Sequence, residues 1–462
     1  MQGWVGAATR TLALPRPREE GYPRRVLLVL LAVLAVDYAD RSAIGALAPE
    51  LKKQFHTGNL AIGLLAAAFS VVATLGSVPA GILADRARRT LLLAVSLALW
   101  SGASVFTGAA VSLEMLLAAR VILGVVTATG RPVIASLTGD LFSPGDRGRV
   151  LGAIDSGELL GTGLGFLVAG LVARWLSWRW VFWLLALAGL CLVASALRLP
   201  EPARTAADDA KDEIAHDELG RQVEDEGAEP DERIVVGREQ RDRSFLSAVA
   251  LFVHIRTFVL VLVSDSIGYF FFAGLRTFVV VFMVEQYGVR QANADLALLL
   301  GGTGAVVGVF VGGRVGDALL RRGRITARLE VACAGYLIAT AALFPAVLLT
   351  SLWPSIPLLF AGAFGLALPM PSLDAVRLDV VHPDLWGRAE STRNVFKIAA
   401  EAIAPVVFGL LADRIAGGGR AGVQAAFLIT LPTVALSGLL LLVVRRCYAP
   451  DVAAVNASLS DD

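Results

Sequence analysis

Long apolar segments recur along the chain, separated by short polar stretches and by one long charged stretch in the middle. A helix needs about 20 residues to cross a bilayer core of about 30 Å. Twelve segments meet this length and predict twelve membrane-spanning helices. In the first half they lie near residues 26–47, 60–82, 90–110, 113–138, 150–174 and 177–197. In the second half they lie near residues 257–284, 294–314, 327–350, 355–378, 393–415 and 422–444.

The charged stretch in the middle has a different composition from the spans. It contains the acidic runs DDAKDE and EDEGAEPDE, and a stretch of this kind does not bury enough apolar surface to form a core. The predicted organisation is a cytoplasmic N-terminal segment (1–25), a six-helix bundle (26–198), an acidic linker (199–250), a second six-helix bundle (251–446) and a cytoplasmic tail (447–462). The fold class is therefore an all-α membrane protein with two pseudo-symmetric bundles.

The placement of arginines predicts the orientation of the spans, because cytoplasmic loops carry an excess of Lys and Arg. Arginines gather in the loops after spans two, four, eight and ten and directly after span twelve, and these segments belong to one side. We therefore expect both termini and the linker to be cytoplasmic, in a multi-pass protein of the plasma (cell inner) membrane. Lys52 and Lys53 are a minor exception on the other side.

Composition narrows the function further. The chain of 462 residues is 56% hydrophobic with a net charge of +1, which gives no indication of a nucleic-acid partner. Its three cysteines lie far apart, which argues against a disulfide framework or a metal site. No P-loop of the GxxxxGK[ST] kind and no catalytic triad stand out. We expect no cofactor, no use of ATP and no enzymatic activity.

One loop motif occurs twice, at the same relative place in the two halves. GILADRARR (81–89) follows span two and GGRVGDALLRR (312–322) follows span eight, and the copies are 232 residues apart. In each copy a Gly precedes an Asp by four positions and arginines follow. The repeat indicates two similar halves, although ordinary clustering of cytoplasmic arginines is an alternative. The motif residues of interest are Gly81, Asp85, Arg86, Arg89, Gly313, Asp317 and Arg321.

This motif and the arrangement of six spans, linker and six spans resemble the major facilitator superfamily over nearly the whole chain. The resemblance implies a central cavity between the bundles and secondary active transport by alternating access. It also implies that the motif loops form a cytoplasmic gate, whose contacts break when the protein opens inward. The partners expected are a small solute and membrane lipids, with the protein acting as a monomer.

A narrower resemblance is to the Spinster-like transporters. DYADRSAIGALAPELKKQF (37–55), LWSGASVFTG (99–108), RVILG (120–124), GDLF (139–142) and GTGLG (161–165) are similar to that family's patterns. It implies an amphipathic or lipid-like cargo, such as a lysolipid or a sphingoid-like molecule, with protons as the coupling ion. One departure concerns span four, where the family carries a Glu seven residues after the Arg and this chain has Thr127.

Other functions stay open beside this one. Symporters of small organic anions share much of the first-span pattern, and in that case the arginines of spans one and four would bind the carboxylate. Multidrug efflux is a further alternative, but the span-five pattern GxxxGPxxGG of drug/proton antiporters is absent. A non-transporting receptor that signals through the acidic linker is the alternative from a different class.

Three charges, Asp37, Asp40 and Arg41, lie inside the first span. A charge at the bilayer centre costs about 2.5–3.5 kcal/mol or more, so it persists where it faces a cavity or a partner. Asp37 and Arg41 are four residues apart and can pair on one helix face. The rise per residue places Asp40 about 21 Å and Arg120 about 18–20 Å from the cytoplasmic edge. We expect these two in one network, and a purely structural ion pair is the alternative.

The short loop between spans four and five places two further charges at a similar depth. Arg131 and Glu158 both lie about 12 Å from the cytoplasmic edge. Our hypothesis is that Glu158 supplies the acidic group missing at Thr127 and exchanges the proton, with Arg131 as its counter-ion. A passive ion pair is the alternative. Thr127 itself is a candidate for lining the cavity.

The second half has its own intramembrane charges. Asp265, Tyr269 and Arg276 of span seven are candidates for lining the substrate cavity, although the aromatic run 269–272 is as suited to packing or lipid contact. Four charges nearer the cytoplasm are assigned to the cytoplasmic gate. They are Asp374, Arg377, Lys397 and Glu401.

Overall fold

The computed structural model describes most of the chain. The described residues are 22–86, 88–130, 133–134, 137–138, 144–199, 219, 222–223, 227–231, 234–235, 245–382, 385–415 and 419–460. Every regular element within them is a helix, and ten helical segments, one of them made of two successive helices, are long and apolar enough to cross a membrane.

The helices of the first half are α2 (Tyr22–Ala46), α3 (Ala48–Phe55), α4 (Asn59–Arg86), α5 (Arg89–Gly108), α6 (Leu113–Thr127), α8 (Pro144–Trp175) and α9 (Arg179–Leu197). The helices of the second half are α12 (Phe245–His254), α13 (Arg256–Tyr287), α14 (Gln291–Leu320), α15 (Ala327–Leu348), α16 (Leu352–Ala367), α17 (Pro369–Asp379), α18 (Trp386–Arg414), α19 (Gly419–Val444) and α20 (Tyr448–Ser460).

These helices provide the predicted spans in the predicted order. Helices α2 and α6 occupy the places of the first and fourth spans, and they fall outside the ten because α2 carries several charges and α6 has only 15 residues. The tenth span consists of α16 followed by α17. The break lies at Leu368 because Pro369 and Pro371 lack the N–H groups that would continue the helix.

The first half packs closely because small residues line its helix contacts. Gly157, Gly161 and Gly165 of α8 face α2, and a Cβ added to Gly161 would lie 2.2 Å from the carbonyl oxygen of Ala35. Only a residue without a side chain fits there, and such glycines let two membrane helices approach closely. This contact fixes α2, which carries Asp37, Asp40 and Arg41, against α8.

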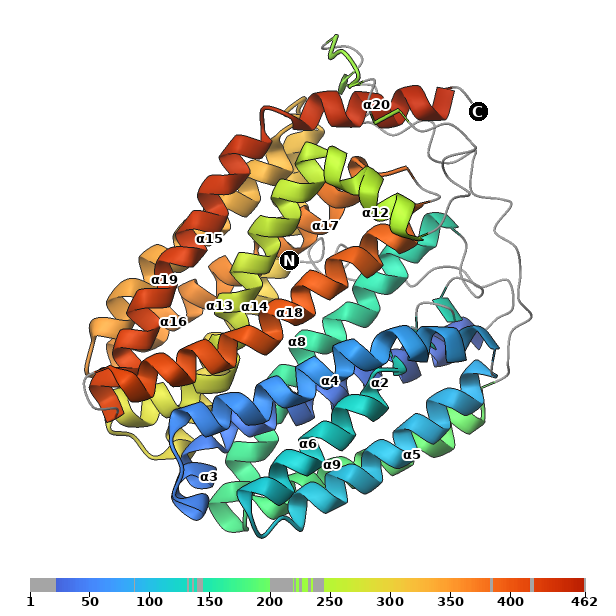
Figure 1. Ribbon diagram of the computed structural model, residues 1–462. Coiled ribbons are helices and arrows are strands. Elements are labelled where there is room, and N and C mark those ends of the chain that lie inside the picture. The colour runs from blue at the N-terminus through green and yellow to red at the C-terminus, as the bar shows by residue number, and fades with distance from the viewer. Residues whose placement is uncertain are drawn as a thin grey trace, which may run out of the picture.

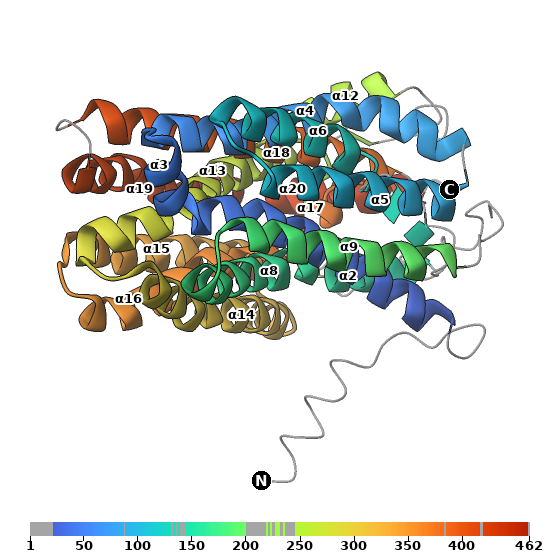
Figure 2. The same cartoon turned by 90° about the horizontal axis from the view of Figure 1, so that it is seen from below.

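The two halves meet most closely at one end of the molecule. Figures 1 and 2 show α3 at one end of the bundle, which we call the α3 end; the opposite end carries α20. At the α3 end, Lys52 forms an ion pair with Glu285 at 2.9 Å, and the backbone of Gly63 lies so close to the carbonyl of Pro405 that a Cβ would be 2.2 Å from it. The structure is therefore closed at the α3 end.

Two segment boundaries differ from the sequence-based prediction. The second half begins with α12 at Phe245, inside the stretch assigned to the linker. The segment 447–462, expected as a tail, forms α20 through Ser460. This helix is docked on the bundle: the Tyr448 hydroxyl donates to Asp379 at 2.6 Å, and the backbone N–H of Thr257 donates to Asp451 at 2.8 Å.

Candidate functional site

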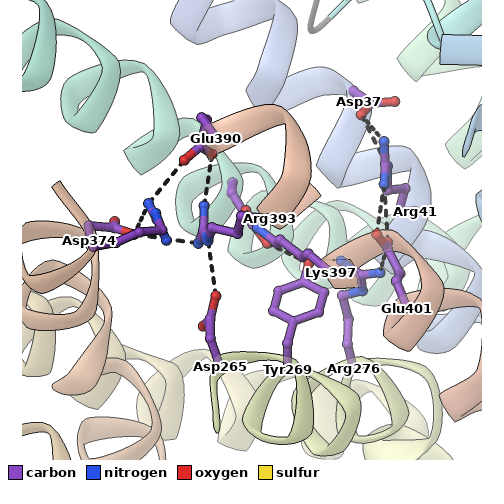
Figure 3. A network of polar contacts seen from close by, with 12 residues as sticks. Asp37, Arg41, Asp265, Tyr269, Arg276, Asp374, Glu390, Arg393, Lys397 and Glu401 are labelled. Carbon is purple, nitrogen blue, oxygen red and sulfur yellow. Dashed lines mark hydrogen bonds and ion pairs between the residues drawn. The ribbon is translucent and has the colours of Figure 1, made fainter. Parts of the chain in front are cut away.

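Glu401 lies at the centre of a charge network that joins the two halves (Figure 3). Its carboxylate accepts hydrogen bonds from the Nη1 of Arg41 on α2, at 3.1 and 3.2 Å. It also accepts one from Arg276 on α13. Arg41 in turn donates to Asp37 at 2.7 Å, one helical turn away. A single carboxylate is thus held between a guanidinium of each half.

Aromatic rings hold these arginines in place. The guanidinium of Arg41 lies over the rings of Tyr38 and Phe69, with its carbon 4.7 and 4.6 Å from their centroids. The guanidinium carbon of Arg276 also lies over the Tyr38 ring, 5.7 Å from its centroid. Stacking of this kind orients a guanidinium and compensates part of its lost hydration. Arg41 and Arg276 are therefore positioned to present donors to one shared acceptor.

A small cavity opens directly beside this network. Its lining residues include Arg41, Arg120, Arg276 and Glu401, together with the apolar Ile44, Leu65, Phe69 and Pro405. Three cationic side chains and one carboxylate around apolar walls form a setting in which an anion can be bound by bidentate hydrogen bonds.

A second buried ion pair also connects the halves. The Nζ of Lys397 on α18 lies 2.8 Å from Glu158 on α8, and the hydroxyl of Tyr269 on α13 donates to the other carboxylate oxygen at 2.8 Å. Lys397 also lies over the Tyr269 ring, 4.4 Å from its centroid. Glu158 is 2% exposed, and these two partners of its carboxylate belong to the opposite half.

Asp40 and Arg120 form an ion pair within the first half. Arg120 donates to Asp40 at 2.8 Å and to Thr107 at 3.3 Å, and its guanidinium lies over Phe182. The two side chains are 0% and 1% exposed. The structure thus brings together the two residues that the depth argument places at one level.

A chain of buried, half-buried and exposed charges continues from the centre towards the α20 end. Arg393 binds Asp265 at 2.9 Å and Glu390 at 3.0 Å. Arg377 links Glu390 to Asp374, at 3.0 and 2.9 Å. Asp265, predicted to line the substrate cavity, is therefore the partner of an arginine on α18 (Figure 3).

A second cavity lies inside the first half, next to the central network. Asp37, Arg41 and Thr127 line its polar side. Its apolar lining is made by Val33, Leu34, Val36, Leu93, Leu97, Trp100, Val126 and Ile134. Among the described residues, no cluster of three His, Cys, Asp or Glu side chains could hold a metal ion.

The chain was compared with known protein families and structures. Residues 30–389 match the family model of the Major Facilitator Superfamily. The chain belongs to this superfamily. Superfamily members are transporters rather than enzymes, and the chain is accordingly a multi-pass membrane transporter with the all-α superfamily fold.

Individual relatives and structures of the superfamily refine this picture. The D-galactonate transporter of Escherichia coli is 24% identical over 64% of this chain and 67% of its own length. Protein spinster of Drosophila melanogaster is 27% identical over 38% of this chain, a match that spans only 29% of its own length. A solved bacterial homolog of the human lysosomal transporter Spinster, inward-facing and occupied, superposes with a TM-score of 0.73 at 18% identity. That structure covers 94% of this chain and 99% of its own, so the chain has the Spinster-like form of the superfamily fold.

The assignment of Lys397 and Glu401 to a gate near the membrane edge is corrected by their positions. Span eleven was expected to begin at 393, but α18 begins at Trp386, so the two residues lie about 16 and 22 Å along a helix of 29 residues. Both side chains contact the first half in the middle of the bundle. They belong to the central network with Arg276 and Tyr269.

The structure describes only part of the superfamily loop motif. Arg89 is buried, whereas the surroundings of Gly81 and the side chains of Asp85 and Arg86 lie outside the described residues. In the second copy Asp317 binds Arg328 of α15 at 3.2 Å, a contact within one half. Gly313 lies beside Pro371, and Arg321 caps the end of α14. Arg131, the partner predicted for Glu158, also lies outside the described residues.

Sequence reasoning missed Asp413 at the end of α18. Its carboxylate accepts hydrogen bonds from the backbone N–H groups of Asn59 and Leu60, at 3.0 and 2.7 Å, and so caps the first turn of α4 in the other half. A signal was present, because GLLADR (409–414) nearly duplicates GILADR (81–86) of the motif.

Proposed function

We propose that the protein is a secondary active transporter that works by alternating access and carries an organic anion together with a proton. The observation that supports this most strongly is the position of Glu401 between Arg41 and Arg276. A carboxylate of the cargo offers the two guanidinium groups the same acceptor geometry that Glu401 offers. The cargo can therefore displace Glu401 and take over both arginines.

Displacement of Glu401 by the cargo would couple cargo binding to proton binding, because the net charge of the buried site is kept at zero. Asp37, Arg41, Glu401 and Arg276 together carry no net charge when all are ionised. When a monoanion binds both arginines, Glu401 loses its cationic partners in a buried site, where the neutral form of a carboxyl group is favoured. Uptake of one proton by Glu401 then restores neutrality.

An amphipathic anion, such as a lysolipid, is a second candidate cargo. The apolar cavity between α2, α5 and α6 supports it, because this cavity begins at Asp37 and Arg41 and continues along Leu93, Leu97 and Trp100. An acidic head group at the arginines could extend an alkyl chain into this space. The similarity to a D-galactonate transporter supports the small organic anion.

The transporter is further proposed to be a monomer in the plasma (cell inner) membrane, with the α20 end and both termini in the cytoplasm. The loops rich in arginine lie towards that end. In this orientation the α3 end, where the structure is closed, faces outward.

Cargo binding to the purified protein tests the function directly. Sugar acids, lysophospholipids and lipophilic cations are added in turn, and the unfolding temperature is measured, because a ligand that binds the folded state raises it. We expect sugar acids to stabilise the protein and Arg276→Gln to abolish the effect. Arg324→Gln, which removes an exposed arginine away from the network, is the matched control and should keep it.

The other outcomes discriminate between the candidates. Stabilisation by lysophospholipids alone would select the amphipathic cargo. Stabilisation by cations alone, retained in Arg276→Gln, would contradict anion transport through this site.

A further inference from the structure

One buried and one half-buried carboxyl group at the α3 end take no part in the central network. Glu50 lies on α3 in the first half, and Asp295 lies near the start of α14 in the second half. Asp295 is 3% exposed, and neither of its carboxylate oxygens has a hydrogen-bond partner among the residues that the structure describes. The Oε2 of Glu50 is likewise buried without a partner. Unpaired buried carboxylates are costly, so their presence at this interface needs a reason.

Asp295 points across the interface between the halves. It lies against Gly170 of α8, where an added Cβ would be 2.6 Å from Oδ2. The absence of a side chain at Gly170 leaves the space that this carboxyl group occupies. Separation of α8 from α14 would therefore expose Asp295 to water, and closure buries it.

The surroundings supply no cation to this pair among the described residues. Glu50 is the charged group whose field acts on Asp295, and it has the same sign. Lys52 on α3 is engaged with Glu285 of α13, and α16, which packs along α14, has no charged residue. Three remaining cations on the neighbouring segments are exposed: Lys53, Arg174 and Arg290.

We propose that Glu50 and Asp295 form a proton-binding latch, which lets the halves close at the α3 end with at least one of the two carboxyl groups neutral and favours opening when both are ionised. Two like charges at a poorly hydrated interface repel each other and lose hydration, and both costs decrease when the interface opens to water. The latch rests on the proposed alternation between the halves, but not on the identity of the cargo.

The direction of the pH effect follows from the environment of Glu50. Burial raises the pKa of Glu50 to about 7, which means that the closed state binds the proton more tightly than the open state does. Closure at the α3 end is therefore favoured at low pH and loses this advantage as the pH rises towards 7. If the α3 end faces outward, the latch responds to external pH.

Distance measurements between spin labels test the latch in the full-length protein in lipid nanodiscs. The labels replace the exposed Ser177 and Ser351, which lie at the α3 end on different halves, and the three native cysteines are replaced. Between about pH 5.5 and about pH 8.5 we expect the ratio of open to closed distances to rise about tenfold or more. Glu50→Gln/Asp295→Asn should reduce this change to less than about twofold, with the closed distance dominant at both pH values.

Two further variants make the result decisive. Glu285→Gln removes another carboxylate at the same end and should leave the pH response in place. Gly63→Leu inserts a side chain against Pro405 and should open the α3 end at any pH. A missing pH response while Gly63→Leu opens the protein would refute the latch alone, as would an undiminished response in Glu50→Gln/Asp295→Asn. If Gly63→Leu also failed to open the α3 end, the alternation itself would be contradicted.

Discussion

The buried carboxylates of the central region differ in where their partners come from. Asp40 is paired with Arg120 inside the first half, whereas Glu401 and Glu158 receive hydrogen bonds from both halves or from the opposite one. A buried charge is stable only with its partner. On the proposed alternation between the halves, the contacts of Glu401 and Glu158 across the interface would change, while the Asp40–Arg120 pair can persist.

Removing one member of the Asp40–Arg120 pair should be costly for stability. Asp40→Asn leaves the guanidinium of Arg120 buried with a neutral partner, and we expect a loss of about 3–5 kcal/mol in the free energy of unfolding. Unfolding of the purified protein in detergent by a denaturant measures this. Asp317→Asn, at a half-exposed ion pair with Arg328, is the control and should cost less than about 1 kcal/mol. Equal effects of the two substitutions would refute the distinction.

At the scale of helices, contact between α2 and α8 depends on which glycines face the partner. A Cβ on Gly161 would lie 2.2 Å from the Ala35 oxygen, whereas nothing lies within 4 Å of a Cβ on Gly163. The two glycines belong to the same GTGLG stretch and differ only in the face that they occupy. Composition alone does not distinguish them.

The two positions give a matched pair of substitutions. Gly161→Ala forces α8 away from α2 and should destabilise the protein by about 1–3 kcal/mol. Gly163→Ala should be neutral or slightly stabilising, because alanine has the higher helix propensity. Thermal unfolding of both variants measures the difference, and a Gly161→Ala protein as stable as Gly163→Ala would mean that the helices are not packed as described.

Helix positions and depths could be predicted from the sequence, and contacts between the halves could not. The rise per residue was enough to relate Asp40 to Arg120. The same argument gave the wrong depth for Lys397 and Glu401, because the start of their helix was predicted too late. The first two turns of α18 are helical but polar, and hydropathy does not assign such residues to a span. Glu158 and Lys397 are 239 residues apart, and depth alone does not tell which faces of two helices meet.

At the scale of the whole molecule, the structure is held closed at the α3 end by contacts between helices that belong to different halves. Helices α4 and α18 lie alongside each other in opposite directions (Figure 1). Asp413 at the end of α18 caps the beginning of α4. A carboxylate at a helix N-terminus satisfies free N–H groups and interacts favourably with the helix dipole.

Loss of this cap should shift the whole transporter towards opening at the α3 end. Asp413→Ala removes the acceptor, and a cap is worth about 1 kcal/mol, which corresponds to about a fivefold change in the ratio of the two states. Asp413→Asn keeps an acceptor oxygen and should retain most of the closed population. Distances between labels at Ser177 and Ser351 report the ratio. An unchanged distribution in Asp413→Ala would show that the cap does not contribute to closure.

Near-identical hexapeptides end α4 and α18, and they bear on which conformation of the transporter predominates in the absence of cargo. GLLADR places Asp413 at the α3 end, and GILADR places its own Asp at the α20 end. On the proposed alternating mechanism, the Asp413 cap contributes about 1 kcal/mol to the state that is closed at the α3 end. A preference set by contacts of this size is a small free-energy difference, so one substitution at such a contact is enough to change which state predominates.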